Sequence, residues 1–135
     1  MPGMTYPEMW KMLEENGHDA LIATVRPDGR PHCVPVWYTL DEGEIVFSTD
    51  INSVKAVNLR SNPRVAVTIS QSANPTAFVM IDGLAAFLHA AESEHHRLLE
   101  AIFARYGERY EGQVNLNQTA IIRVKVLRMV GENYG

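Results

Sequence analysis

The sequence is poor in the residues that build several common kinds of site. Cys33 is the only cysteine among 135 residues, which excludes an intrachain disulfide and a cysteine-based zinc site. No apolar run approaches the roughly 20 residues that a membrane-spanning helix needs. The first residues also lack the basic flank and apolar core of a signal peptide. These absences predict a soluble, cytoplasmic protein without a membrane partner.

Basic residues are fewer than acidic ones. Twelve Lys and Arg stand against 16 Asp and Glu, for a net charge of −4. A protein that reads a nucleic acid backbone needs a basic face, so no nucleic acid partner is expected. No Gly-x-Gly-x-x-Gly or P-loop motif is present, which argues against a dinucleotide-binding Rossmann site or an NTPase. A small anionic ligand remains possible, because it needs only a local group of donors and cations.

Histidine offers no convincing metal or nucleophile site. His95 and His96 are adjacent, so on a helix they point about 100° apart and do not readily share a metal. His32 and Cys33 are neighbours on a predicted strand and face opposite sides, which prevents a Cys–His pair. We expect no metal site, and the catalytic residues stay unknown.

Short strand-forming segments are what the sequence has in abundance. Strands are predicted at residues 20–25, 32–40, 45–48, 65–69, 77–88 and 120–130, and short helices at 7–16, at 53–60 and from about 93. The turns at 27–29 and 41–43 make the first three strands an antiparallel meander. Pro35 predicts an irregular or edge position, and Gly83 a bulge.

The order of these segments predicts the fold class. Most connections are too short for a helical crossover, so the strands pair antiparallel. With a hydrophobic fraction of 46%, this favours a mostly β protein with short helices, a six-stranded closed or partly closed barrel. Residues 1–135 are expected to form a single domain.

The segment 47–64 is the most informative for function. It reads as a strand, a polar turn and a helix whose first turn carries a hydroxyl at Ser53 and an ammonium group at Lys55. Ser53 is a good N-cap, and a helix start attracts anions through its free N–H groups and its dipole. Lys55 opposes that dipole unless an anion lies nearby. The alternative reading is a capped surface helix with a solvated lysine.

The same segment resembles the pyridoxamine 5′-phosphate oxidase-like, FMN-binding split-barrel superfamily. Phe47, Thr49, Ser53, Lys55 and Asn62-Pro63 keep the spacing of that pattern, but Val54 stands where the oxidases have an arginine. The run from Lys55 through Asn58, Leu59 and Arg60 to Pro63 and Arg64 is also similar to the flavin/deazaflavin oxidoreductases that use coenzyme F420.

The resemblance implies a six-stranded split β-barrel of the FMN-binding type and a set of cofactor contacts. The implied contacts with the ring are made by Val34, Pro35, Val36 and Trp37. Those with the ribityl chain are made by Ser48 and Thr49, and those with the phosphate by Ser53, Lys55 and Asn58 or Arg60. Tyr38 is a speculative proton donor. The resemblance also implies a homodimer with the cofactor at the subunit interface.

Three functions follow as hypotheses from this resemblance. The first is an oxidoreductase that transfers a hydride between a deazaflavin, coenzyme F420, and a small conjugated organic substrate. The second is an FMN-dependent oxidoreductase of the pyridoxamine-phosphate-oxidase-like type. The third is a non-catalytic protein that binds a flavin or haem on the same barrel.

Overall fold

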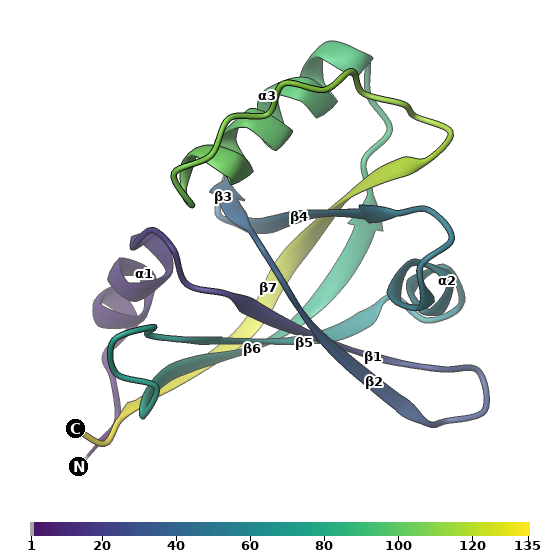
Figure 1. The fold of residues 1–135 in the computed structure, drawn as a ribbon. Coiled ribbons are helices and arrows are strands. Elements are labelled where there is room, and N and C mark those ends of the chain that lie inside the picture. The colour runs from purple at the N-terminus through teal and green to yellow at the C-terminus, as the bar shows by residue number, and fades with distance from the viewer. Residues whose placement is uncertain (1) are drawn as a thin grey trace.

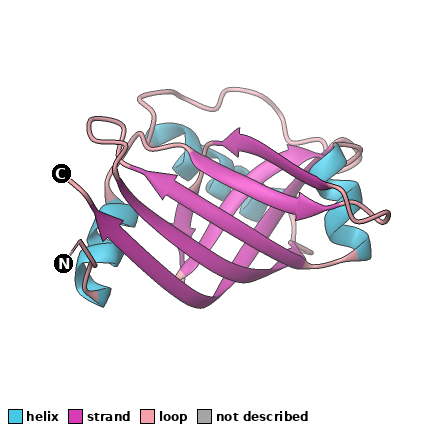
Figure 2. Ribbon diagram, turned by 90° about the horizontal axis from the view of Figure 1, so that it is seen from below, coloured by secondary structure: helices cyan, strands magenta, loops and turns pink. Residues whose placement is uncertain are grey.

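A single curled antiparallel sheet dominates the computed structural model, which describes residues 2–135 (Figures 1 and 2). Its seven strands are β1 (Ala20–Val25), β2 (Pro31–Val36), β3 (Thr39–Asp41), β4 (Glu44–Asp50), β5 (Arg64–Ser70), β6 (Ala77–Phe87) and β7 (Thr119–Asn133). The helices are α1 (Tyr6–Glu14), α2 (Val54–Ser61) and α3 (Glu92–Ala104). The strand order is β2-β1-β5-β6-β7-β4-β3. The mostly β, antiparallel class is confirmed.

The predicted number of six strands is wrong, because the segment 32–40 does not form one strand. Its first half, β2, pairs with β1, and its second half, β3, pairs with β4 at the opposite edge of the sheet. The expected three-stranded meander is therefore divided at Trp37 and Tyr38. One short segment supplies both edges of the sheet and holds the half-barrel in its curled shape.

Contacts from far along the chain explain the break. The backbone N–H of Tyr38 donates to the Tyr106 hydroxyl (3.1 Å), and the Tyr38 hydroxyl donates to the Leu13 carbonyl (2.7 Å). Arg105 lies over the Tyr38 ring and donates to the Leu13 carbonyl (2.8 Å). Tyr38 is thereby taken out of the ladder and buried completely. We call Leu13, Tyr38, Arg105 and Tyr106 the junction cluster.

Two local expectations for the strands are confirmed. Pro35 lies in β2, an edge strand, where its missing N–H breaks no interior ladder. The pairing of β6 with β7 shifts register between Asp82 and Gly83. A Cβ at position 83 would stand 2.5 Å from Val124 Cγ1 and 2.8 Å from the Lys125 carbonyl oxygen. Because β7 lies this close, only glycine fits at position 83.

The core fills the concave side of the sheet and continues beneath α1 and α3. Buried side chains from α1, α2 and five strands form the main hydrophobic cluster together with Tyr38, and a second cluster joins α3 to β4 and β7. Alternation along β7 puts Ile122 and Val124 inside and Lys125 outside. The two ends of the chain lie side by side, where the Asn133 N–H donates to the Pro2 carbonyl (Figure 1).

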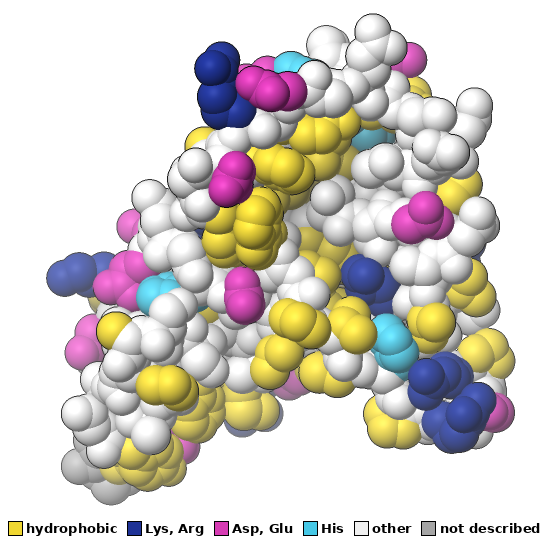
Figure 3. Space-filling model, viewed as in Figure 1, with side chains coloured by type: hydrophobic (Ala, Val, Ile, Leu, Met, Phe, Trp, Pro, Cys, Tyr) yellow, Lys and Arg dark blue, Asp and Glu magenta, His cyan; other side chains and the backbone are white. Residues whose placement is uncertain are grey.

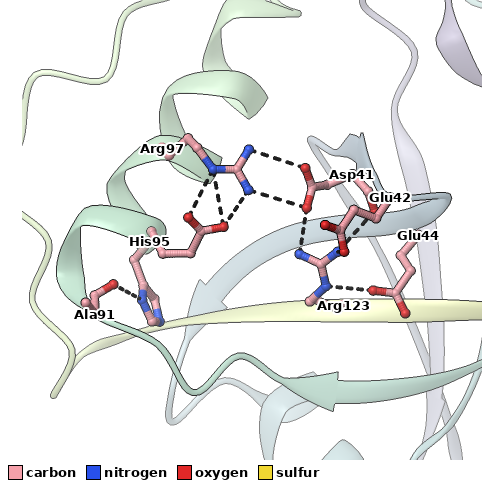
Figure 4. Close-up of polar contacts among 8 residues, drawn as sticks. Asp41, Glu42, Glu44, Ala91, His95, Arg97 and Arg123 are labelled. Carbon is pink, nitrogen blue, oxygen red and sulfur yellow. Dashed lines mark hydrogen bonds and ion pairs between the residues drawn. The ribbon is translucent and has the colours of Figure 1, made fainter.

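An ion-pair network fastens α3 to the strands beneath it (Figure 4). Asp41 binds Arg97 of α3 (3.3 Å) and Arg123 of β7 (2.9 Å), and Arg123 also binds Glu44 (2.6 Å). These carboxylates explain the partial burial of the Arg123 side chain. The network fastens the N-terminal half of α3, at Arg97, to β3 and β7.

The convex face of the sheet is unusually apolar for an exposed surface. Strand registers align Pro35, Leu21, Thr68, Met80 and Val130 in one row across five strands. Leu21, Met80 and Val130 are exposed, as are Val25, Leu84 and Leu127 near them. Among the described residues, no helix is long and apolar enough to cross a membrane.

Candidate functional site

The start of α2 is a rigid polar corner built by the turn after β4. The Asp50 carboxylate accepts from the Asn52 N–H (2.7 Å), and the Asp50 carbonyl accepts from the Ser53 N–H (3.1 Å). Ser53 is the N-cap, as predicted, and its hydroxyl accepts from the Ala56 N–H (3.2 Å). Thr49, buried at the end of β4, lies 2.7 Å from the Ser53 hydroxyl oxygen. Thr49 and Ser53 are thus brought together, with Ser48 half-buried one residue earlier.

Lys55 stands in the first turn of this helix without a counter-charge. Its side chain is half-buried, and no ion pair in residues 2–135 includes it. Burial lowers the pKa of the Lys55 ammonium group. Desolvation and the helix dipole both disfavour its charge, and a bound anion would relieve both. The corner therefore has the features of an anion site that its own residues leave unneutralised.

The implied ring contacts on β2 divide between the two faces of the sheet. Val34 and Val36 pair with the buried residues Ile22 and Ala20, so they face the concave side. Pro35 pairs with exposed Leu21 and faces the convex side. Val34 and Val36 are therefore available to a ligand on the concave side, and Pro35 is not.

Trp37 forms one wall of an aromatic group at the junction. Its indole stacks on the Tyr106 ring at 4.6 Å with an interplanar angle of 6°, and meets Phe103 edge to face at 5.5 Å. Trp37 is still 40% exposed, so part of its ring surface is accessible. The residue that holds it, Tyr106, was not identified from the sequence.

Tyr38 does not have the position of a proton donor, and that hypothesis is wrong. Its ring is fully buried, and its hydroxyl already donates a hydrogen bond to the Leu13 carbonyl. Burial also raises the pKa of Tyr38 well above its ordinary value. A phenol that is buried and bonded in this way does not exchange protons with a ligand above the sheet. Tyr38 instead fixes the place where the strand divides.

Asn58 and Arg60 lie on different sides of α2 and are not gathered around Lys55. The Asn58 amide is buried and donates to the Thr24 hydroxyl of β1 (3.0 Å), so it ties the helix to the sheet. Arg60 lies over the Phe87 ring at 5.1 Å and lines a pocket of about 410 Å³ with His95 and Thr119. Direct contact of both residues with one phosphate is therefore not favoured by the geometry.

Two basic residues near α2 were missed by reasoning from the sequence. Arg26 and Arg30, at the ends of the β1–β2 turn, line a pocket of about 330 Å³ together with Val54 and Asn58. Their signal in the sequence is weak, since arginines on both sides of a Pro-Asp-Gly turn are typical of any exposed hairpin.

The histidines and the cysteine that we considered as metal or nucleophile sites have separate surroundings. His32 pairs with buried Thr24, whereas Cys33 is exposed on the opposite face. The His95 ring nitrogen Nδ1 donates to the Ala91 carbonyl (3.1 Å), and His96 faces Glu100 (2.7 Å). These neighbours do not converge on a shared ligand.

A hollow runs between the arm formed by β1 and β2 and the lobe formed by α3 and β4 (Figure 3). Hydrophobic side chains line it, and a basic side chain lies inside it, on the side where α2 closes the gap. Its surface is suited to a flat apolar ring with an anionic extension.

The chain belongs to the pyridoxamine 5′-phosphate oxidase family, whose model matches residues 11–131. A pyridoxine/pyridoxamine 5′-phosphate oxidase of Pseudomonas paraeruginosa (strain DSM 24068 / PA7) is 34% identical over 87 residues, or 64% of this chain. The corresponding oxidase of Pseudomonas putida (strain GB-1) matches equally well. The chain spans 40% of the length of these curated relatives. This is a family of flavin-binding oxidoreductases, and the resemblance seen in residues 47–64 is confirmed at that level.

Solved structures share the fold over almost the whole chain. A conserved hypothetical protein of Mycobacterium tuberculosis is 26% identical with a TM-score of 0.78, covering 96% of this chain and 85% of that one. A structure described as an F420 reductase is 23% identical with a TM-score of 0.73, covering 88% and 93%. A FAD-binding protein of Mesorhizobium loti is 19% identical with a TM-score of 0.72, covering 96% and 94%.

Proposed function

We propose that this chain is an oxidoreductase that binds coenzyme F420 or FMN at the start of α2 and catalyses hydride transfer to or from a small conjugated organic molecule. The observation that carries the proposal is Lys55, a half-buried ammonium group in the first turn of a helix with no counter-charge in the described residues. An anionic cofactor supplies the missing charge. Membership of a flavin-binding family supports the choice of cofactor.

The residues present fit the phosphate end of such a cofactor. Lys55 supplies a cation, Thr49 and Ser53 supply hydroxyl groups 2.7 Å apart, and the first turn of α2 supplies backbone N–H groups. Charge-assisted hydrogen bonds of this kind are about twice as strong as neutral ones. The corner would therefore fix one end of the cofactor.

The concave side of β2 suits the ring. Val34 and Val36 offer an apolar strand surface, Trp37 offers the exposed part of its indole, and Ser48 is half-buried at the end of β4 nearest the corner. When bound, the flavin or deazaflavin supplies the hydride chemistry. The protein's own residues orient the cofactor and exclude water from the hollow.

Deazaflavin is the first choice of cofactor because of position 54. The helix carries Val54 where the oxidases have a second cation, so the FMN-binding pattern of those enzymes is incomplete here. The run from Lys55 to Arg60 is similar to the F420-dependent branch, and a protein described as an F420 reductase has the same fold. FMN remains the second candidate, since the spacing of Thr49, Ser53 and Lys55 is that of the oxidases.

We further propose that the chain forms a homodimer. The exposed apolar row on the convex face, including Leu21, Met80 and Val130, supports self-association, because contiguous apolar surface of this kind commonly marks an interface. Two-fold symmetry would give two equivalent sites.

A cofactor titration panel tests the proposal. The purified protein is titrated with FMN, FAD and F420, with binding followed by absorbance and fluorescence and mass followed by sedimentation. Saturable binding of F420 in preference to FMN, with turnover of a quinone or tetrapyrrole by the reduced cofactor, is the expected result. Preference for FMN with turnover would select the second candidate. Binding without turnover would make the protein a carrier, and no binding of any of the three would refute the proposal.

A further inference from the structure

A second basic site lies beside α2, on the side of the helix away from Arg60. The pocket between the β1–β2 turn and α2 has a volume of about 330 Å³. It is lined on one side by the turn and on the other by a single face of the helix: Arg26, Arg30, Asn52, Val54, Val57 and Asn58.

The helix side of this pocket has no cation of its own. Val54 and Val57 are 44% and 46% exposed there, and Asn58 is buried and bonded to Thr24. Residues 54, 57 and 58 share one helical face, and Lys55 lies about 100° further round. Any positive charge in this pocket therefore comes from the turn.

The turn has an ordered backbone and anchors the guanidinium group of Arg26, whereas the Arg30 side chain is 70% exposed. Gly29, with φ of +90°, donates to the Arg26 carbonyl (2.8 Å), and the Arg26 N–H donates to the Arg30 carbonyl (3.0 Å). Arg26 Nη1 donates to the Pro31 carbonyl (2.9 Å), which anchors that side chain at one nitrogen. Preorganised donors lose less entropy when a ligand binds.

Asp28 orients Arg30 without neutralising the pocket. Its carboxylate accepts from Arg30 Nε (2.8 Å) and from the Arg30 N–H (3.1 Å). Within residues 2–135, no hydrogen bond occupies the two terminal nitrogens of Arg30, and the same holds for Nη2 of Arg26. Two guanidinium groups face one carboxylate, so the lining carries a net positive charge on a chain whose overall charge is −4.

We propose that Arg26 and Arg30 form an anion subsite that binds a phosphate or carboxylate group in the tail of the cofactor. The subsite is next to the contact made by Lys55 and distinct from it. The turn thereby supplies the cations that Val54 does not. This inference rests on the proposed function, and it adds a determinant for the charge and length of the cofactor tail.

The test compares flavins and a deazaflavin that carry different numbers of anionic groups, and riboflavin and FMN are the pair that differ by one phosphate alone. Wild type, Arg26→Gln/Arg30→Gln and the control Arg109→Gln are titrated with riboflavin, FMN, FAD and F420. Arg109 is exposed and outside the pocket, so its loss should change no affinity. The double variant should bind the anionic ligands at least about ten-fold more weakly and riboflavin unchanged, as expected for lost charge-assisted contacts.

The pattern of losses identifies the bound group. A loss for FMN assigns the subsite to the ribityl phosphate, and a loss for FAD or F420 alone assigns it to a second anionic group. Equal affinities of wild type and double variant for all four ligands would overturn the inference. Unfolding midpoints check that the variants are folded. If the double variant is unfolded, the same titrations are made with Arg30→Gln alone, which keeps the hydrogen bond of Arg26 to the Pro31 carbonyl.

A cofactor-free measurement separates this inference from the proposed function. If wild type binds no flavin or deazaflavin, the proposed function fails, and inorganic pyrophosphate is titrated while the amide signals of Asn52 and Val54 and the Arg Nε signals are followed by NMR. Saturable shifts that disappear in the double variant would support the subsite on its own. Absence of shifts in wild type would overturn it.

Discussion

The junction cluster and the start of α2 are both polar sites at the edge of the core, but they are satisfied to different degrees. At the junction, the Tyr38 hydroxyl, the Tyr38 N–H and the Leu13 carbonyl all have partners within the protein, and in the described part of the cluster only Arg105 Nε is buried without one. At α2, Lys55 is half-buried with no counter-charge. Buried polar groups in a stable fold are normally paired. The contrast agrees with a structural role for the junction and with the anion site that we propose at the start of α2.

The largest expected effect is on stability at the junction. Tyr38→Ala removes a fully buried ring and leaves the Tyr106 and Arg105 side chains facing a cavity, so it should lower the free energy of unfolding by about 3–5 kcal/mol. Urea denaturation followed by far-UV circular dichroism measures this. Tyr134→Ala, at an exposed tyrosine near the C-terminus, should change it by less than about 0.5 kcal/mol. Similar losses in both variants would remove the structural role given to Tyr38.

The next effect is on binding at α2. Lys55→Met keeps the length and apolar stem of the side chain but removes its charge, so cofactor affinity should fall by about 1.5–3 kcal/mol. Without cofactor, the variant should be at least as stable as wild type, because a desolvated charge has been removed. Isothermal titration and urea denaturation give the two numbers, with exposed Lys11→Met as the control. A loss of stability without a loss of affinity would place Lys55 with the structural residues instead.

The smallest effect is a pH dependence that only α2 should show. Burial lowers the pKa of Lys55 in the folded protein, whereas an unfolded lysine titrates near 10.4. Between these two values the unfolded chain holds more protons, so the contribution of Lys55 to stability rises with pH in that window. A bound anion favours the charged form, so cofactor affinity should fall over the same window. Cofactor titrations at increasing pH, up to the ordinary pKa of lysine, should show this fall in affinity in wild type and not in Lys55→Met.

Local chemistry made much of the fold predictable. Ser53 caps α2, Gly83 marks the bulge and Pro35 lies in an edge strand. Each of these features depends on the residue itself and a few neighbours in the sequence. The break at Trp37 and Tyr38 was not predictable in this way. Residues 32–40 are rich in β-branched and aromatic side chains and read as one strand, while Tyr106, which accepts the Tyr38 N–H, lies 68 residues away.

The candidate site was predictable to a similar extent. The Ser53 and Lys55 spacing points to the start of α2, because helix starts are defined by adjacent residues. Asn58 or Arg60 was expected at the phosphate, but the buried amide of Asn58 is bonded to Thr24, 34 residues earlier, through the packing of α2 on β1. Arg26 and Arg30 were missed because only the curl of the sheet brings their turn beside the helix.

The division of one segment between two sheet edges also limits how this protein can vary. Since residues 31–36 are in register with β1 and residues 39–41 with β4, an inserted or deleted residue near position 37 must be absorbed at one edge or the other. A slip of one residue reverses every inward and outward side chain of the shifted strand. Length changes in homologous sequences should therefore gather in the loops at 71–76 and 107–118 and avoid residues 31–41.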